Sequence, residues 1–293
     1  MAAKINYERV EVLSELIGKL GLKTIYFIEE KDKQLEAMRN LYAKTGHVGY
    51  VCLLAVSNAL ISYRLSVKGE EYWLTFSKEL SKTKPSLNYA LENMVKFLRK
   101  HRLNVINLEQ KINRLRRLYS SNIVHKIFNN PEAYARNIVK LWKDISEALH
   151  TDPKSKTIVF SIKMFYYAYY ASTDIRIRLP MEIPIPVDFR VSIISLTSGL
   201  LQFKRSMMFS DKVKLLLSKY GDAVREAWNK VSERAKVPPL NLDALIWVFG
   251  RNVTLQCSRE NIVRKTFEYL RELFDREPDT LMKKLVYEFF KYC

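Results

Sequence analysis

Apolar residues recur every three or four positions along most of this chain, which is the spacing of one face of an α-helix. The pattern predicts an all-α protein, because it leaves almost nowhere for a strand to begin. The predicted helices, in chain order, are 7–20, 32–43, 50–64, 70–78, 86–100, 108–118, 131–149, 156–171, 189–200, 212–219, 222–235, 242–256, 259–274 and 279–292.

Prolines and the longest apolar runs refine this pattern. The stretch Leu179–Val187 (LPMEIPIPV) carries three prolines, which forbid a helix and favour an extended path. Pro238 and Pro239 predict a linker over 237–240, because a residue before proline avoids the α region. The apolar runs 51–61 and 157–170 are shorter than the ~18 to 20 residues of a membrane-spanning helix. They are expected to be buried core helices, and no membrane association is expected.

Charge adds the first indication of a partner. The chain has 293 residues with 49 Lys and Arg against 31 Asp and Glu, a formal net charge of +18, and its composition is that of a globular protein. Such an excess favours a polyanionic partner, although a generally basic proteome would give the same number. Between Lys96 and Lys126 nine basic residues face one acid, Glu109, so this segment is either a phosphate-facing surface or a solvated helix face.

Cysteine and histidine usage argues against metal chemistry. The three cysteines, Cys52, Cys257 and Cys293, are too few for a four-thiolate cluster, and their wide spacing predicts a reducing compartment without disulfides. The four histidines are scattered and form no ligand-spaced pair. No cofactor and no metal are expected.

The segment Lys154–Tyr170 places lysines in a helix that is otherwise apolar or aromatic. At helical spacing Lys156, Phe160 and Lys163 lie along one stripe. Burial disfavours the charged form of a lysine, and a neutral amine is the nucleophile that Schiff-base chemistry requires. The alternative is that Lys156 is an ordinary exposed first-turn residue and that Lys163 extends to water.

Asp188 follows the proline-rich stretch and directly precedes an apolar helix, where an N-cap is expected. A cap alone explains an aspartate at this position. In the functional interpretation the same ionised carboxylate faces the lysine-bearing helix across a cleft. It would take a proton from the lysine or stabilise a developing positive charge.

Four blocks of sequence resemble one known family, the archaeal 8-oxoguanine DNA glycosylases, often called AGOG. They are SNALISYRLSVKGEEYW (57–73), SKTIVFSIKMFYYAY (155–169), LPMEIPIPVDFRV (179–191) and VPPLNLDALIWVFGR (237–251), and they occur in family order. The resemblance covers about 5–251. It implies a two-lobed all-α fold of the helix-hairpin-helix DNA glycosylase type, with DNA and the damaged base bound in a cleft between the lobes.

The resemblance also implies roles for individual residues. Lys156 in the KTIVF block matches the family's catalytic lysine, and Asp188 in the PVDFR block matches its catalytic aspartate. The base pocket implied by the family comprises Phe160 and Trp247 stacking on the flipped base, Lys163 and Asp243 bonding its edge, Trp73 lining the pocket, and Gln34, in KDKQLEA, reading the purine. Without the resemblance, Phe160 and Trp247 would be interpreted as core aromatics and Asp243 as an N-cap.

The implied function is base excision repair. Lys156 would attack C1′ of the damaged nucleoside, release 8-oxoguanine and form a Schiff base whose β-elimination cuts the strand. A monomer acting on duplex DNA is expected, with single-stranded DNA as a further candidate substrate, in a cytoplasmic, nucleoid-associated location. The alternatives are a glycosylase for another damaged base and a non-catalytic helical DNA-binding protein.

Two regions depart from the pattern of helix-hairpin-helix glycosylases. The hairpin stretch Leu149–Lys156 has no glycine, so phosphate contact there is expected from Lys154, His150 or amides at the following helix start. Residues 1–293 are expected to form a single glycosylase unit of two interleaved lobes. Within it, 258–293 forms an extension of two amphipathic helices for which the resemblance offers no counterpart.

Overall fold

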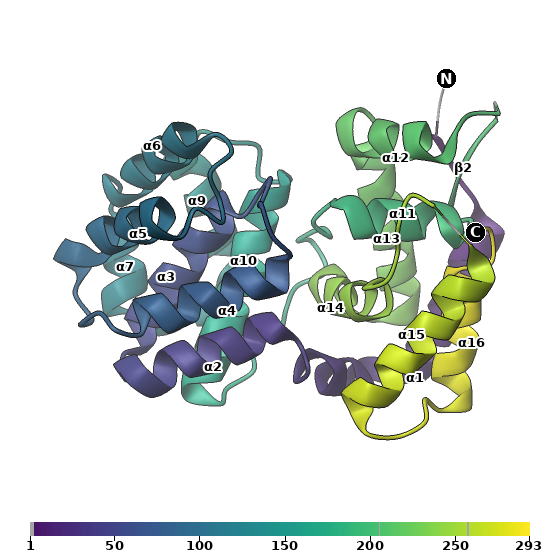
Figure 1. Ribbon diagram of the computed structural model, residues 1–293, viewed down its shortest axis with the longest axis horizontal. Helices are drawn as coiled ribbons and strands as arrows, with labels where there is room; N and C mark the ends of the chain where they lie inside the picture. Colours follow the sequence, from purple (N-terminus) through teal and green to yellow (C-terminus); the bar gives the residue numbers. More distant parts are fainter. Residues whose placement is uncertain (1–2, 205, 257) are drawn as a thin grey trace. The chain divides into compact units, whose positions relative to one another are not determined.

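The computed structural model describes residues 3–204, 206–256 and 258–293, and these residues are mostly helical (Figure 1). The all-α prediction is confirmed. The helices are α1 (Tyr7–Glu29), α2 (Lys33–Thr45), α3 (Val48–Ile61), α4 (Gly69–Leu80), α5 (Leu87–His101), α6 (Leu108–Tyr119), α7 (Ile123–Asn129), α8 (Pro131–Arg136), α9 (Ile138–Leu149), α10 (Lys156–Thr173), α11 (Phe189–Thr197), α12 (Phe209–Ser218), α13 (Gly221–Ala235), α14 (Pro239–Phe249), α15 (Arg259–Phe274) and α16 (Thr280–Phe289).

Two short strands were not predicted. β1 (Ala3–Ile5) pairs antiparallel with β2 (Leu201–Phe203), with Lys4 opposite Gln202. Three residues are too few to show the alternation that identifies a strand in sequence.

Several helix boundaries also differ from the predictions. The predicted helix 131–149 is two helices, because Asn137 leaves the helical region and its side chain accepts a hydrogen bond from the Lys140 amide. The predicted linker 237–240 is wrong at Pro239, which begins α14. A proline in the first turn loses no helical hydrogen bond, since that amide has no partner inside the helix.

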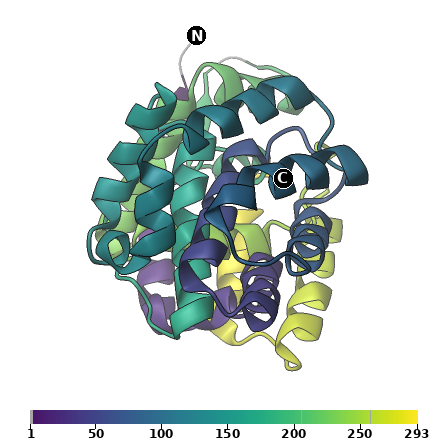
Figure 2. The ribbon, with the colours of Figure 1, turned by 90° about the vertical axis from the view of Figure 1, so that its left-hand side faces the viewer.

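The described chain forms two compact units. The first comprises the described residues up to 31 together with 181–293, and the second comprises 32–180. In the second unit, which Figure 2 turns toward the viewer, α3 packs along α10. Every residue from Gly49 to Ile61 is buried, and so is every residue from Thr157 to Tyr169. The two apolar runs are therefore core helices, as predicted.

A close helix crossing explains one glycine of this core. A Cβ atom built on Gly49 would lie 1.8 Å from the Phe128 carbonyl oxygen. That distance is far inside van der Waals contact, so α3 meets the end of α7 through bare backbone. A side chain at position 49 would force the two helices apart.

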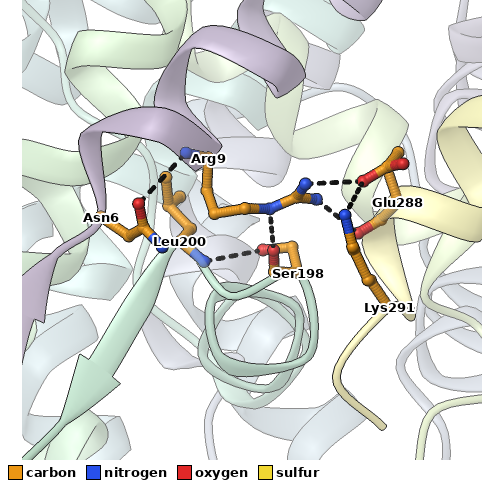
Figure 3. A network of polar contacts seen from close by, with 6 residues as sticks. All are labelled: Asn6, Arg9, Ser198, Leu200, Glu288 and Lys291. Atoms are coloured by element: carbon orange, nitrogen blue, oxygen red, sulfur yellow. Dashed lines mark hydrogen bonds and ion pairs between the residues drawn. The ribbon is translucent and has the colours of Figure 1, made fainter.

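In the first unit, a buried arginine joins the two ends of the chain. Arg9 on α1 is 2% exposed, and its Nη1 lies 2.6 Å from Glu288 Oε2 (Figure 3). Its Nε donates to the Ser198 carbonyl at 2.7 Å, and its Nη2 donates to the Glu288 carbonyl at 3.1 Å. The guanidinium therefore fastens α16 and the end of α11 to α1.

Replacing Arg9 with Met should lower the free energy of unfolding by about 3 kcal/mol, because two backbone carbonyls lose their donor and the largely buried Glu288 carboxylate keeps only Lys291, 3.7 Å away. Urea unfolding followed by circular dichroism measures the loss. Lys19→Met is the matched control on the same helix, because Lys19 and its partner Glu15 are both exposed and such a pair contributes little. Equal midpoints for the two variants would show that Arg9 does not fasten α16.

One of the two described cysteines departs from expectation. Cys52 is buried and free, and burial raises the pKa of its thiol. Cys293 is disulfide-bonded, so the expectation of a chain without disulfides is wrong. Cys257 lies outside the described residues.

None of the helices in the described ranges combines the length and apolar character needed to cross a bilayer.

Candidate active site

Helix α10 carries the stripe predicted from sequence. Lys156 is its first helical residue, half-buried, directly after the turn of residues 150–155. Phe160, one turn later, is 8% exposed, and Lys163 is 1% exposed. The stripe therefore runs from an accessible amine at the start of the helix to a buried amine in its middle.

The buried amine of Lys163 faces a carboxylate on another helix. Its Nζ lies 3.7 Å from Asp32 Oδ2 and 5.2 Å from the centre of the Tyr167 ring, and the Tyr167 hydroxyl donates to the same Asp32 oxygen at 3.0 Å. The interpretation in which Lys163 extends to water is wrong. A buried ammonium group needs such a partner, because desolvation alone costs several kcal/mol.

Asp32 contacts the candidate site residue Lys163, and the sequence analysis did not single it out. It is 7% exposed and caps α2, because its Oδ1 accepts the Gln34 amide at 2.9 Å. The available signal was its position just before an apolar-periodic run, which predicts a cap. Nothing in that pattern shows that the second carboxylate oxygen faces Lys163 and Tyr167.

Gln34 presents an unused hydrogen-bond acceptor in the same region. The residue is 2% exposed, and within the described ranges its Oε1 is buried without a hydrogen-bond donor. A buried amide oxygen left in this state costs about 1 to 3 kcal/mol. Such an atom is a strong candidate for a ligand contact, because a donor on a bound molecule recovers that cost.

Trp73 and Phe160 form an aromatic contact. Their ring centroids lie 6.0 Å apart with an interplanar angle of 79°, and Trp73, on α4, is 1% exposed. The edge of one ring thus meets the face of the other. In the structure Trp73 supports Phe160 from the interior of the second unit.

In the first unit, the proline-rich stretch leads directly into Asp188. Ile183 and Ile185 are fully buried, and Asp188 is 7% exposed at the N-cap of α11. Its Oδ1 accepts the Val191 amide at 2.9 Å. Among the described residues no other donor reaches this carboxylate, so one oxygen caps the helix and the other accepts no hydrogen bond.

Trp247 and Asp243 lie one turn apart on α14. Asp243 is fully buried in the interior of the helix, so its interpretation as an N-cap is wrong. Trp247 is half-buried rather than fully in the core. The Arg190 guanidinium, which the sequence analysis did not single out, stacks 3.7 Å from the Trp247 ring centre and donates to the Trp247 carbonyl at 3.0 Å.

The structure thus groups the predicted residues by unit. The second unit holds Lys156, Phe160, Lys163, Trp73 and Gln34, and the first holds Asp188, Asp243 and Trp247. Within the described ranges, no group of three or more His, Cys, Asp or Glu side chains is arranged to hold a metal ion. What these residues offer is an amine nucleophile, a carboxylate, aromatic faces and buried polar atoms.

Comparison with known proteins shows which family shares this sequence and fold. The AGOG family profile, described as N-glycosylase/DNA lyase, matches residues 14–281. An N-glycosylase/DNA lyase of Methanococcus maripaludis is 31% identical over 92% of this chain and 98% of its own length, and one of Pyrobaculum aerophilum is 32% identical over 86% and 89%. The crystal structure of the 8-oxoguanine DNA glycosylase from Pyrobaculum aerophilum, complexed with 8-oxoguanosine, superposes with a TM-score of 0.72. It shares 29% identity over 85% of this chain and 90% of that one.

These matches define a DNA-repair enzyme that is both a DNA glycosylase and a DNA lyase. The chain belongs to the AGOG family of N-glycosylase/DNA lyases. The family profile extends past residue 251, where the four-block resemblance ended, and it includes α15.

Proposed function

We propose that the chain excises 8-oxoguanine from DNA and cuts the strand through a Schiff base on Lys156, with Asp188 as the second catalytic residue. The substrate assignment rests on one observation above all, the buried Gln34 Oε1 without a donor. 8-Oxoguanine carries a proton on N7 where guanine has none, so an open acceptor favours the damaged base. The related protein solved with 8-oxoguanosine supports the same substrate.

The proposed reaction uses the half-buried amine at the start of α10. The neutral Lys156 Nζ attacks C1′, the C1′–N9 bond breaks, and the base leaves with the bonding electrons and takes up a proton. Opening of the sugar ring gives a protonated Schiff base between Nζ and C1′. Loss of a proton from C2′ then expels the 3′ phosphate, which breaks the strand by β-elimination.

Asp188 supports this reaction as an ionised carboxylate. Its oxygen beyond the helix cap either accepts the proton that Lys156 must lose or stabilises the positive charge that develops on the sugar. Both roles require a carboxylate and neither requires a metal.

The flipped base would be held by the remaining residues. An extruded purine needs aromatic faces to replace stacking and polar groups to replace pairing. We assign the faces to Phe160 and Trp247, the edge contacts to Lys163, Asp243 and Gln34, and the support of Phe160 to Trp73. Stacking on Trp247 uses the face opposite Arg190 or displaces that guanidinium.

The substrate we propose is duplex DNA containing 8-oxoguanine, with single-stranded DNA as a second substrate, bound by a monomer at the nucleoid. The test incubates the wild-type enzyme with an 8-oxoguanine:cytosine duplex and borohydride, which reduces a Schiff base to a stable amine. A covalent protein–DNA adduct is expected. Its absence, on duplexes that the enzyme binds, would overturn the lysine mechanism.

A panel of oxidised and alkylated bases separates the alternatives. Faster excision of a lesion other than 8-oxoguanine would assign the enzyme to that base while keeping the chemistry. Equal binding of damaged and undamaged duplexes with no excision would show a DNA-binding protein without catalysis.

Gln34→Leu should lower kcat/KM for 8-oxoguanine release by roughly ten- to a hundredfold, because a site built around one hydrogen bond loses discrimination when it is removed. Cleavage of a preformed abasic site should change far less, since no base is read. Gln256→Leu, at an exposed glutamine, is the control. Equal losses on both substrates would show that Gln34 acts on folding rather than on the base.

A further inference from the structure

A polar pocket lies in the second unit, outside the residues assigned above. Its volume is about 250 Å³, several times the ~30 Å³ that a water molecule occupies in the liquid. Arg114 and Arg117 of α6 line it, together with Tyr63 and, from the end of α9 and the turn that follows, Leu149 and Thr151. The turn continues directly to Lys156.

Arg114 has donors that the protein leaves unused. Its Nε and Nη2 atoms are buried, and across the described ranges neither has a hydrogen-bond acceptor. An unsatisfied N–H of a charged group is costly, because the group has lost water and gained no partner. A small rotation of the guanidinium into the pocket would allow an anion to accept from these atoms.

Positive charge gathers around the pocket without a compensating acid. Burial lowers the pKa of Arg114, and the like charge of Arg117 lowers it further. Burial also lowers the pKa of Lys111 to about 8, and Arg64 contributes to that shift. In the described part of the chain, none of these four cations forms an ion pair with a carboxylate. The local field therefore favours an anionic ligand.

Hydrogen bonds hold the turn after α9, which lines one side of the pocket. Arg117 Nη1 donates to the Leu149 carbonyl at 3.3 Å, and the Thr151 hydroxyl donates to the same oxygen at 3.1 Å. The Thr151 amide donates to the Ser146 carbonyl at 3.0 Å. Arg117 is thus held by one of its five N–H groups, and the others remain for a ligand.

We propose that this pocket binds one phosphate group of the DNA backbone, held by the guanidinium groups of Arg114 and Arg117. The proposal rests on the proposed function, which makes DNA the substrate. Guanidinium groups suit this role because their planar fork donates two parallel hydrogen bonds to phosphate oxygens. Arginine side chains of α6 would then contact the phosphate, in place of the backbone amides of a glycine-rich hairpin, which this chain does not have.

The basic residues of the segment 96–126 do not all have the same role at this pocket. Lys111 was counted on its phosphate-facing surface, but its side chain is fully buried, with Nζ donating 2.7 Å to the Tyr63 carbonyl. Lys111 therefore cannot contact a phosphate and acts only through its charge. Arg114 and Arg117 supply the direct contacts.

The first test measures the dissociation constant of an undamaged duplex at several salt concentrations. Arg114→Gln and Arg117→Gln should each weaken binding roughly tenfold and reduce the slope of log K against log[salt] by about 0.9, the value of one phosphate. In the double variant the slope of log K against log[salt] should fall by no more than in either single variant, because both side chains hold the same phosphate. Arg114→Lys should keep the slope and lose affinity, since the charge remains and the fork is lost.

Two comparisons make this test specific. Arg136→Gln removes an exposed arginine of the same unit that pairs with Glu132, and it should leave the slope unchanged. Thermal midpoints of all variants establish that they are folded. If Arg116→Gln, at an exposed site on the same helix, weakens binding as much as Arg114→Gln, a diffuse basic face binds DNA and the pocket proposal is overturned.

A second test identifies the source of the phosphate. Single methylphosphonate substitutions along the duplex remove one backbone charge at a time, and one position should weaken wild-type binding while leaving Arg114→Gln unaffected. If no such position exists and inorganic phosphate alone binds the wild type but not the variant, the ligand is a free phosphate and not DNA. If neither ligand distinguishes the proteins, the pocket binds no phosphate.

Failure of this inference is distinguishable from failure of the proposed function. The pocket is tested by binding to undamaged DNA, whereas the function is tested by release of 8-oxoguanine from the wild-type enzyme. Normal excision with unaltered binding of the arginine variants would overturn only the pocket.

Discussion

The Lys156→Gln variant is expected to release no measurable 8-oxoguanine and to form no borohydride-trapped adduct with an 8-oxoguanine:cytosine duplex. Glutamine is one atom shorter than lysine and can still hydrogen-bond, but it has no nucleophilic amine, so the loss should exceed roughly a thousandfold. Single-turnover excision and gel analysis of the trapped complex measure it. Binding to undamaged duplex should persist.

Lys143→Gln is the matched control for this variant. Lys143 is an exposed lysine on the neighbouring helix α9, so its loss removes the same charge without touching the proposed nucleophile. It should trap DNA like the wild type. An adduct that survives Lys156→Gln would assign the nucleophile to another amine and contradict the mechanism.

The Asp188→Asn variant is expected to slow base release by at least roughly a hundredfold while the protein stays folded. Asparagine caps helices as well as aspartate does, so the bond to the Val191 amide is retained and the negative charge alone is lost. Excision rates at saturating enzyme, together with the thermal midpoint, separate the two contributions.

Asp279→Asn provides the comparison, because Asp279 caps α16 in the same way, accepting the Met282 amide at 2.8 Å. Both substitutions should change stability by similar small amounts. Only Asp188→Asn should lose activity. Turnover near the wild-type rate in Asp188→Asn would show that Asp188 acts only as a helix cap and not in catalysis.

Helices were predictable where their signals are local. The spacing of apolar residues located α3 and α10, and the match at α15 extends to both ends, Arg259 and Phe274. The break at Asn137 was missed because asparagine also occurs inside helices. The predicted helix end at Leu20 coincides with the break in α1 at Gly21 (φ 74°, ψ 159°), and the helical residues beyond that break were not predicted.

In the candidate site, too, the features that depend on local spacing were predictable and the contacts between distant elements were not. Helical spacing alone placed Lys163 on the stripe of Lys156, because residues three and four apart share a face. The partner of Lys163 was not predictable, since Asp32 lies on a different element and its position before α2 indicates only a cap. Likewise, a basic segment does not show that Lys111 is buried, or that Arg114 Nε and Nη2 have no acceptor among the described residues.

Three features were predictable from the sequence alone. The protein is helical, Asp188 directly follows the proline-rich stretch, and α10 carries one lysine at its start and another in its middle. These features depend on residues close together in the chain, where backbone sterics and periodicity act directly. Only the tertiary structure decided that Tyr167 and Asp32, 135 positions apart, surround Lys163, and that Cys293 is disulfide-bonded. Such pairings follow from how whole helices pack, and no local pattern encodes them.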